Sequence, residues 1–191
     1  DNAQFVRSIW EVSNKSPKWV PYLTGGPFRK WYGNNCYVID LENVINFKGA
    51  CVRNKDLYFK EGFEWSRVSS NHFGVRKVKD AVFGGASQMA FLSQKEELNK
   101  YLAIYNSKIV EFYIKFLNPT MITQAGDINR IPICPDYPSE FNTFVDECVQ
   151  ISMLDWDAHE TSWDFQKNEL LNITEQDYLD NGPCVVIEEG E

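Results

Sequence analysis

Residues 57–69 read Leu-Tyr-Phe-Lys-Glu-Gly-Phe-Glu-Trp-Ser-Arg-Val-Ser, and this stretch decides the fold class. After a turn at residues 60–62, the aromatic side chains of Phe63 and Trp65 alternate with polar ones. A period of two is typical of a β-strand with one buried face. Aromatic and β-branched runs bounded by turn residues recur over residues 31–40, 72–78 and 86–93. We therefore predict a twisted, partly closed and mostly antiparallel sheet over residues 1–93.

The hydrophobic period changes to a helical one after residue 93. Residues 95–105 and 107–117 carry apolar side chains at helical spacing, and Asn106 or Ser107 can cap the second helix. Asn118-Pro119 should end that helix, because proline disfavours the helical region for the residue before it. A long amphipathic helix is predicted from Ser139 to His159, with Phe144 among the core-facing side chains.

These patterns predict an α+β fold in three parts. The first is a domain over residues 1–135, with its sheet over 1–93 and helices over 95–130. A long helix with a packing segment follows over residues 136–170, and an acidic tail occupies residues 171–191. No run approaches the roughly 18 apolar residues that a membrane span needs, so we expect no membrane contact and a cytoplasmic location.

Charge is divided unequally along the 191 residues, whose formal net charge is −8. Residues 1–110 hold 16 basic and 10 acidic side chains, whereas residues 111–191 hold 3 and 17. Such asymmetry suggests one surface for a polyanion and another that faces solvent or a partner. The five cysteines form no C-x-x-C pair, and only two histidines could join them as metal ligands. We therefore expect free thiols, with no zinc site and no disulfide framework.

Catalytic motifs are absent from the sequence. The loop of a DNA amino-methyltransferase is usually Asn/Asp-Pro-Pro-aromatic, and the nearest match, Asn118-Pro119-Thr120-Met121, lacks the second proline and the aromatic residue. We interpret it as a helix stop. No glycine-rich cofactor or phosphate loop is present. A nuclease metal site has one weak candidate around Glu64, which lacks the required lysine. The chain is expected to be non-catalytic.

The basic half combines cationic, aromatic and small polar side chains in turn-flanked positions, which suits DNA binding because arginine and lysine neutralise phosphates while polar side chains read base edges. The candidate DNA-binding residues are Arg29, Lys30, Trp31, Tyr32, Arg53, Lys55, Lys60, Arg67, Ser69, Arg76 and Lys77. Among them, Arg67 or Arg29 is the expected base reader. Gly84-Gly85 more often marks a turn than a ligand loop, although glycines there would let a DNA backbone approach closely.

Three stretches resemble a known family: residues 25–35, residues 59–69, and residues 102–132 with their L-N-P-T and Q-A-G-D-I-N-R-I-P motifs. Together with Trp163-Asp164-Phe165, they are similar to the C-terminal region of BREX-type (phage-growth-limitation) adenine-specific DNA methyltransferases. The third stretch is also similar, more loosely, to the end of target-recognition domains in type I restriction specificity subunits. One position departs from the family pattern: the strand after residues 84–87 continues with Gln88-Met89, where the resemblance implies more apolar residues.

The resemblance implies a domain that recognises a duplex DNA sequence and positions an adenine for N6 methylation. The S-adenosylmethionine site and the catalytic loop would then lie upstream, in a methyltransferase domain of the same polypeptide, and no cofactor is expected in this chain. Two alternatives stay open. A protein-docking module, facing the catalytic domain or another defence-system subunit, would need an exposed apolar patch. A nuclease would need carboxylates clustered beside a lysine.

Overall fold

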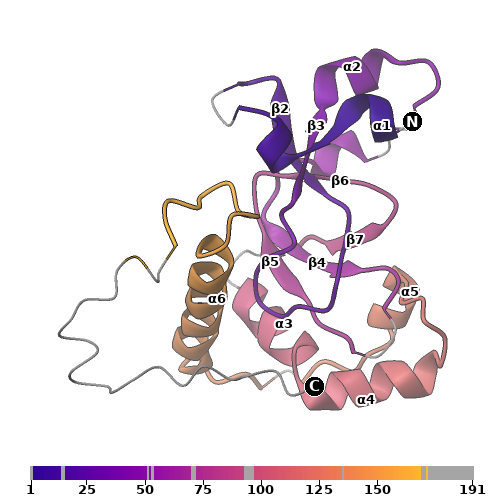
Figure 1. Cartoon of the computed structure of the whole chain (residues 1–191). Helices are drawn as coiled ribbons and strands as arrows, with labels where there is room; N and C mark the ends of the chain where they lie inside the picture. The colour runs from indigo at the N-terminus through magenta and orange to yellow at the C-terminus, as the bar shows by residue number, and fades with distance from the viewer. Residues whose placement is uncertain are drawn as a thin grey trace, which may run out of the picture.

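The computed structural model describes residues 2–13, 16–50, 52, 54–69, 72–92, 97–134, 136–168 and 171. The described part is mixed α+β, with strands in the first half followed by helices, which confirms the predicted fold class. The expected single sheet is instead two separate sheets (Figure 1). Arg53 and most of the acidic tail lie outside the described residues.

The first sheet has the strand order β1-β3-β2-β6. Its strands are β1 (Val6–Ser8), β2 (Trp19–Leu23), β3 (Tyr37–Asp40) and β6 (Val82–Phe83). Strand β3 pairs antiparallel with β1 and β2, whereas β2 pairs in parallel with β6. Short helical segments surround it: α1 (Asn2–Phe5), η1 (Ile9–Glu11), α2 (Leu41–Asn46) and η2 (Lys55–Leu57).

The second sheet is built around the stretch that alternates in sequence. Strand β4 (Gly62–Ser66) lies between β5 (Arg76–Val78) and β7 (Ser87–Ala90), and both pairings are antiparallel. Phe63 and Trp65 are buried, as the period of two predicts, and the Trp65 indole N–H donates to the Thr123 carbonyl at 3.1 Å. The intervening Glu64 is buried as well, so both faces of β4 are covered.

Helices α3 (Leu98–Tyr105) and α4 (Lys108–Leu117) pack their buried side chains into the same core as Phe63 and Trp65. The Ser107 hydroxyl accepts the Val110 amide proton and caps α4, which confirms one of the two predicted caps. Helix α4 ends one residue before Asn118, as Pro119 requires. The four-residue helix α5 (Ala125–Ile128) follows.

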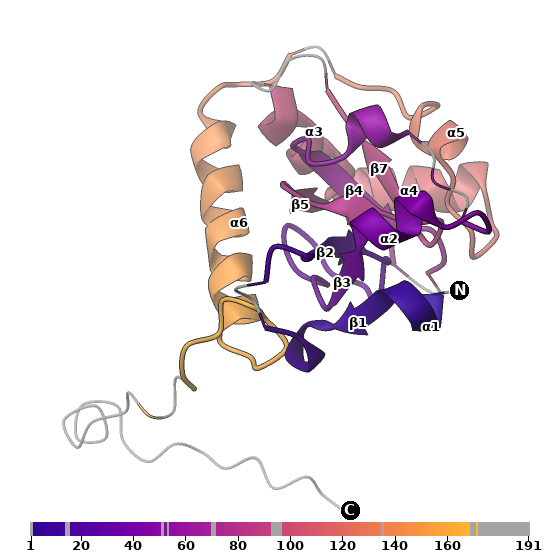
Figure 2. The ribbon, with the colours of Figure 1, turned by 90° about the horizontal axis from the view of Figure 1, so that it is seen from above.

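The long helix α6 (Phe141–Asp157) lies within the predicted span and stands beside α3 in both views (Figures 1 and 2). Its buried side chains are Val145 and Trp156. The Arg29 guanidinium carbon lies 4.9 Å from the centroid of the Trp156 ring, and Arg29 also pairs with Asp155 at 3.4 Å. The expected burial of Phe144 is wrong: 58% of this residue is exposed, because α3 covers only the neighbouring stripe of the helix.

Substitutions on α6 should report this orientation. Phe144→Ala is expected to change the free energy of unfolding by less than about 0.5 kcal/mol, because the ring already faces solvent. Val145→Ala should cost about 2 kcal/mol, since it removes two buried methyl groups and leaves a cavity. Urea denaturation of both variants measures the difference. Equal costs at the two positions would mean that the helix is rotated about its axis.

Candidate nucleic-acid interface

Arg76, a predicted DNA contact, is instead part of a buried polar cluster inside the second sheet. Its side chain is 1% exposed, and Nε donates to Glu64 Oε1 at 3.1 Å. The strand register places Arg76 directly opposite Glu64 and Ser87 opposite Ser66. The Ser87 hydroxyl donates to the second carboxylate oxygen, and the Arg76 guanidinium reaches the Ser66 hydroxyl at 3.3 Å. Arg76 therefore stabilises the sheet and cannot touch DNA in this fold.

Burial raises the pKa of the Glu64 carboxyl, and the charge of Arg76 and the hydrogen bond from Ser87 oppose that rise. A carboxylate with a guanidinium and a hydroxyl donor satisfies its main hydrogen-bonding needs without water. The arrangement also removes the nuclease candidate, because Glu64 has no access to a substrate or to a solvent-borne metal ion.

Residues 25–35, the first sequence motif, are held in place by stacking and hydrogen bonds with other parts of the chain. Arg29 stacks on α6, and the Lys30 ammonium donates to the Asn106 carbonyl at 2.7 Å. Trp31 exchanges two backbone hydrogen bonds with the strand beside it, from its N–H to Val75 O at 2.9 Å and from Lys77 N–H to Trp31 O at 2.8 Å. These contacts fix the loop against β5 and the helices, so Arg29 and Lys30 act first as structural side chains.

Two further predicted residues have partners, and a third lies elsewhere. Lys77 pairs with Glu61 at 3.4 Å, and the Ser69 hydroxyl donates to the His72 carbonyl at 2.6 Å. Tyr32 lies in a separate pocket near the end of α6. Lys55, Lys60 and Arg67 remain: all are exposed, and no described acidic side chain lies within ion-pairing distance of them.

The structure also has an open groove with a volume of about 550 Å³, and chain segments that line it continue directly into the segments that carry these three cations. Its lining includes Asn54, Gly84, Gly85, Gln88, Met89 and Ala125. Lys55 directly follows Asn54 in the sequence, and Lys60 lies two residues before the start of β4. The Arg67 amide donates to the Ala86 carbonyl at 3.1 Å, which places Arg67 beside the glycine turn. We name this surface, with its three cations, the glycine groove.

The composition of the glycine groove suits a polyanion with readable edges. Gly85 is open, with no atom within 4 Å of the position that a Cβ would occupy, so a backbone can approach closely there. A Cβ at Gly84 would collide with the Tyr22 side chain, which would have to move to admit any other residue there. The carboxamides of Asn54 and Gln88 can both donate and accept, as recognition of base edges needs.

Sequence reasoning missed Asn54 and Gln88 as site residues. Asn54 has an αL backbone (φ 53°), a conformation that asparagine tolerates well. No pattern in the sequence reveals this conformation. Gln88-Met89 stood out only as a departure from the family-like pattern. The structure places that departure inside the glycine groove.

A second hollow, of about 290 Å³, contains the only arrangement among the described residues that resembles a catalytic dyad. His72 Nδ1 lies 2.7 Å from Glu111 Oε1, and the Asn118-Pro119-Thr120 turn forms one wall. The Asn118 carboxamide is fully used: it donates to the Ile122 carbonyl and to Asp127, and it accepts from Thr120. No group remains to bind a substrate amine, so the structure supports the interpretation of these residues as a helix stop.

Glu111 should contribute a pH-dependent part of the stability. Burial raises the pKa of its carboxyl, but hydrogen bonds from His72 and Lys115 outweigh that effect and hold the pKa below its usual value. A lowered folded-state pKa stabilises the protein above the unfolded pKa of about 4.3, and this contribution is lost as the pH falls through the folded value. In Glu111→Gln, the decline in unfolding free energy between about pH 5 and pH 3 should be shallower. Glu140→Gln, at an exposed carboxylate, is the control and should follow the parent curve.

Sequence comparisons identify relatives of this chain, although no protein-family model matches it. It is 33% identical over 172 residues to the adenine-specific methyltransferase BrxX of Escherichia coli O9:H4 (strain HS). It is 30% identical over 201 aligned positions to the adenine-specific methyltransferase PglX of Lacticaseibacillus casei (strain Zhang). The chain is homologous to part of these adenine-specific methyltransferases. The alignments cover 87% and 92% of the chain but only 14% and 17% of the relatives.

These comparisons confirm the family resemblance as homology over most of the chain. That the chain corresponds to the C-terminal region of these relatives stays a prediction. In the described part of the chain, no helix is long and apolar enough to cross a membrane. Nor do the described histidine, cysteine and acidic side chains include a group of three or more that could hold a metal ion. Cys36, Cys134 and Cys148 are free thiols, whereas Cys51 and Cys184 lie outside the described residues.

Proposed function

We propose that this chain recognises duplex DNA through the glycine groove and forms the non-catalytic DNA-recognition part of an adenine-specific methyltransferase. The observation that carries the proposal is an open, glycine-lined groove with the carboxamides of Asn54 and Gln88 in its lining, next along the chain or by a backbone hydrogen bond to exposed cations without acidic partners among the described residues. Homology to adenine-specific methyltransferases supports a DNA substrate for the whole protein. Recognition would position an adenine for transfer of a methyl group to its N6.

Different side chains of the groove would do different work. Lys55 and Lys60 are suited to phosphates, because an ammonium group is a compact charge on a flexible stem. Arg67 can hold a guanine edge by two hydrogen bonds, and Gln88 can do the same for adenine. Phosphate contacts would set the register on the duplex, whereas Arg67 and Gln88 would supply sequence preference.

The chemistry of methyl transfer is proposed to lie outside these 191 residues. S-adenosylmethionine and the catalytic loop would belong to another domain of the same polypeptide, which would contact the duplex from the opposite side. The fully bonded Asn118 carboxamide supports this division of labour, because the one motif similar to a methyltransferase loop has no free polar group.

A second candidate, protein docking, is favoured by the outer face of α4. Ile109, Phe112 and Phe116 are 68%, 69% and 76% exposed, and they recur at helical spacing beside the partly exposed Tyr113. A contiguous apolar stripe of this kind commonly marks a protein interface. The methyltransferase domain or another defence-system subunit would be the partner. Docking through α4 and DNA binding through the glycine groove use different surfaces and can coexist.

The decisive experiment is duplex DNA binding by the chain in which Lys55, Lys60 and Arg67 are all replaced by alanine. Fluorescence anisotropy over a salt series measures both affinity and the number of phosphate contacts. Loss of affinity together with a shallower salt dependence supports the glycine groove. Unchanged binding would show that DNA contacts another surface of the chain, and the glycine groove would lose its proposed role.

A further inference from the structure

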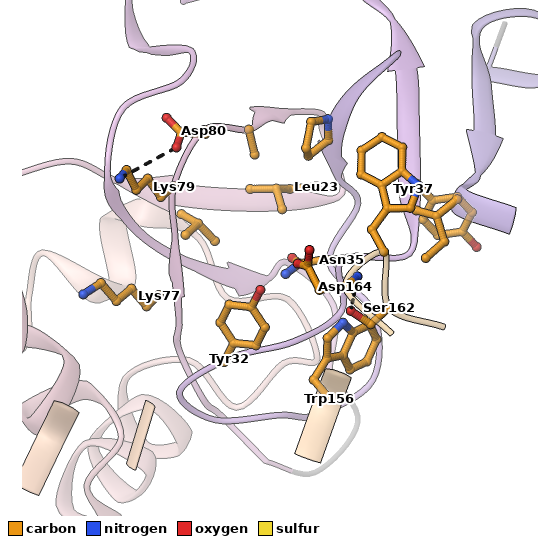
Figure 3. A pocket seen from close by; sticks show the side chains of 15 residues that line it. Leu23, Tyr32, Asn35, Tyr37, Lys77, Lys79, Asp80, Trp156, Ser162 and Asp164 are labelled. Atoms are coloured by element: carbon orange, nitrogen blue, oxygen red, sulfur yellow. Dashed lines mark hydrogen bonds and ion pairs between the residues drawn. The ribbon is translucent and has the colours of Figure 1, made fainter. Parts of the chain in front are cut away.

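A pocket distinct from the glycine groove lies where the first sheet meets the segment that follows α6 (Figure 3). Its volume is about 240 Å³. Residues from β2, from the loop before β3, from the end of β5 and from positions 162–164 surround it. Two stretches singled out in the sequence, at residues 25–35 and 163–165, therefore come together here. This pocket and the glycine groove share no lining residue.

Aromatic side chains and a polar centre characterise the pocket. Tyr32, Tyr37 and Trp163 contribute rings to its lining. In Figure 3, the Tyr32 hydroxyl points toward the side chains of Asn35 and Asp164, which lie in the middle of the pocket. Burial raises the pKa of Tyr32 and the charges of Asp157 and Asp164 add to the rise, whereas a hydrogen bond with Asn35 opposes it, so the phenol stays protonated and can donate.

The Trp163 indole N–H is buried and has no hydrogen-bond partner among the residues that the structure describes. Indole is a donor only, so this group can be satisfied only by an acceptor atom. A buried donor without a partner destabilises the folded state and is uncommon in native proteins. Trp163 is among the residues that line the pocket, so a small rotation of its ring would bring the N–H to an acceptor held there.

We propose that this pocket binds a nucleobase as part of a nucleotide. A nucleobase is flat enough to stack on the aromatic rings, and its edge carries the required acceptor next to an amino donor. The acceptor would take the Trp163 N–H, while the amino group would donate to Asp164 or Asn35. Lys77 and Lys79 line the same pocket; they pair with Glu61 at 3.4 Å and with Asp80 at 3.8 Å, and would exchange these carboxylates for the phosphate.

An ammonium or guanidinium group fits these observations less well, although aromatic pockets often bind cations. A cation offers only donors, so the Trp163 N–H would remain without a partner. The Trp156 ring already holds the guanidinium of Arg29, whose carbon lies 4.9 Å from the ring centroid. The volume of about 240 Å³ also suits one base rather than a drug-sized ligand.

The nucleotide could come from the free pool or from an unpaired position in DNA, and one experiment distinguishes the sources. The ¹H–¹⁵N spectrum of the intact chain resolves indole N–H signals, and Trp163→Phe assigns the relevant one. The probes are adenosine, guanosine, cytidine and thymidine 5′-monophosphates, followed by a duplex with one bulged nucleotide and the same duplex fully paired. We expect a saturable shift of the Trp163 signal with at least one monophosphate, or with the bulged duplex alone if DNA is the source.

Two variants make the result specific to the pocket. Trp163→Phe keeps a ring but removes the donor, and should weaken binding about tenfold, as the loss of one good hydrogen bond implies; in this variant the backbone amide signals of Tyr32 and Asn35 report binding. Asp164→Ala, at an exposed position, tests the amino contact without disturbing the core. Trp10→Phe is the matched control, because Trp10 is exposed and lies outside the pocket lining.

The proposal is overturned if no monophosphate up to about 10 mM, well above ordinary millimolar binding, and no bulged duplex moves the Trp163 signal. It is also overturned if choline or arginine amide binds there while the nucleotides do not. Because the pocket and the glycine groove have different linings, these outcomes are independent of whether Lys55, Lys60 and Arg67 bind duplex DNA.

Discussion

Arg76→Ala is expected to lower the free energy of unfolding by about 3–5 kcal/mol, the usual cost of removing one partner of a buried ion pair. The substitution leaves the Glu64 carboxylate buried with only the Ser87 hydroxyl as donor, and it opens a cavity between β4 and β5. Urea denaturation at neutral pH measures the loss. Lys79→Ala, one residue beyond β5 at an exposed position, should stay within about 0.5 kcal/mol of the parent chain.

The double substitution Glu64→Met with Arg76→Leu separates the charge from the packing. Replacing both charges with apolar side chains of similar size removes the desolvation cost of the pair, so most of the lost stability should return. A cost below about 1 kcal/mol for Arg76→Ala would contradict the buried pair. DNA binding supplies a further check, because the folded fraction of Arg76→Ala should keep the affinity of the parent chain.

Replacing Lys55, Lys60 and Arg67 together with alanine is expected to weaken duplex DNA binding by about a hundredfold or more at about 0.1 M salt. Each phosphate contact contributes about 0.9 to the slope of log affinity against log salt, so the slope should fall by about 2 to 3. If Arg67 reads a base, its single substitution should cost about 1–3 kcal/mol on the preferred sequence and relax preference at one position. Gln88→Ala should show the same signature without changing the salt slope.

The matched control replaces Lys108, Lys115 and Lys167, which removes the same charge from exposed positions that line neither the glycine groove nor the pocket beside α6. This variant should retain most of the affinity, because screening weakens charges farther than a Debye length, about 10 Å, from the DNA. An equal loss in both triple variants would indicate a diffuse electrostatic effect. In that case the glycine groove would have no special role in recognition.

Several elements could be predicted from the sequence because their signals are local. The alternation around Phe63 and Trp65 marks β4, and the hydroxyl of Ser107 and the ring of Pro119 define the ends of α4. The extent of α6 follows in the same way from the helical period. The homology to adenine-specific methyltransferases was also apparent in the motifs, because a motif is recognised from the order of its residues and needs no knowledge of their contacts.

The candidate site was predicted less well, because a basic side chain carries no local sign of its partner. Arg67 and Arg76 are equally cationic in the sequence, yet one lies exposed beside the glycine turn and the other is 1% exposed. The difference arises from the register of β4 with β5, which sets Arg76 opposite Glu64 across twelve residues of chain. Lys55 and Lys60, predicted to bind DNA, are exposed, and their DNA contact stays a prediction, whereas Asn54 and Gln88 come together on one surface only through folding.

By itself, the sequence determined the mixed α+β class, the positions of β4, α4 and α6, and the kinship with adenine-specific methyltransferases. Only the tertiary structure decided which face of each element is covered. On α6 it buried Val145 and left Phe144 exposed, although both are apolar and adjacent. The physical reason is that periodicity and caps depend on neighbours along the chain, whereas burial and ion pairing depend on which distant segment packs against each face.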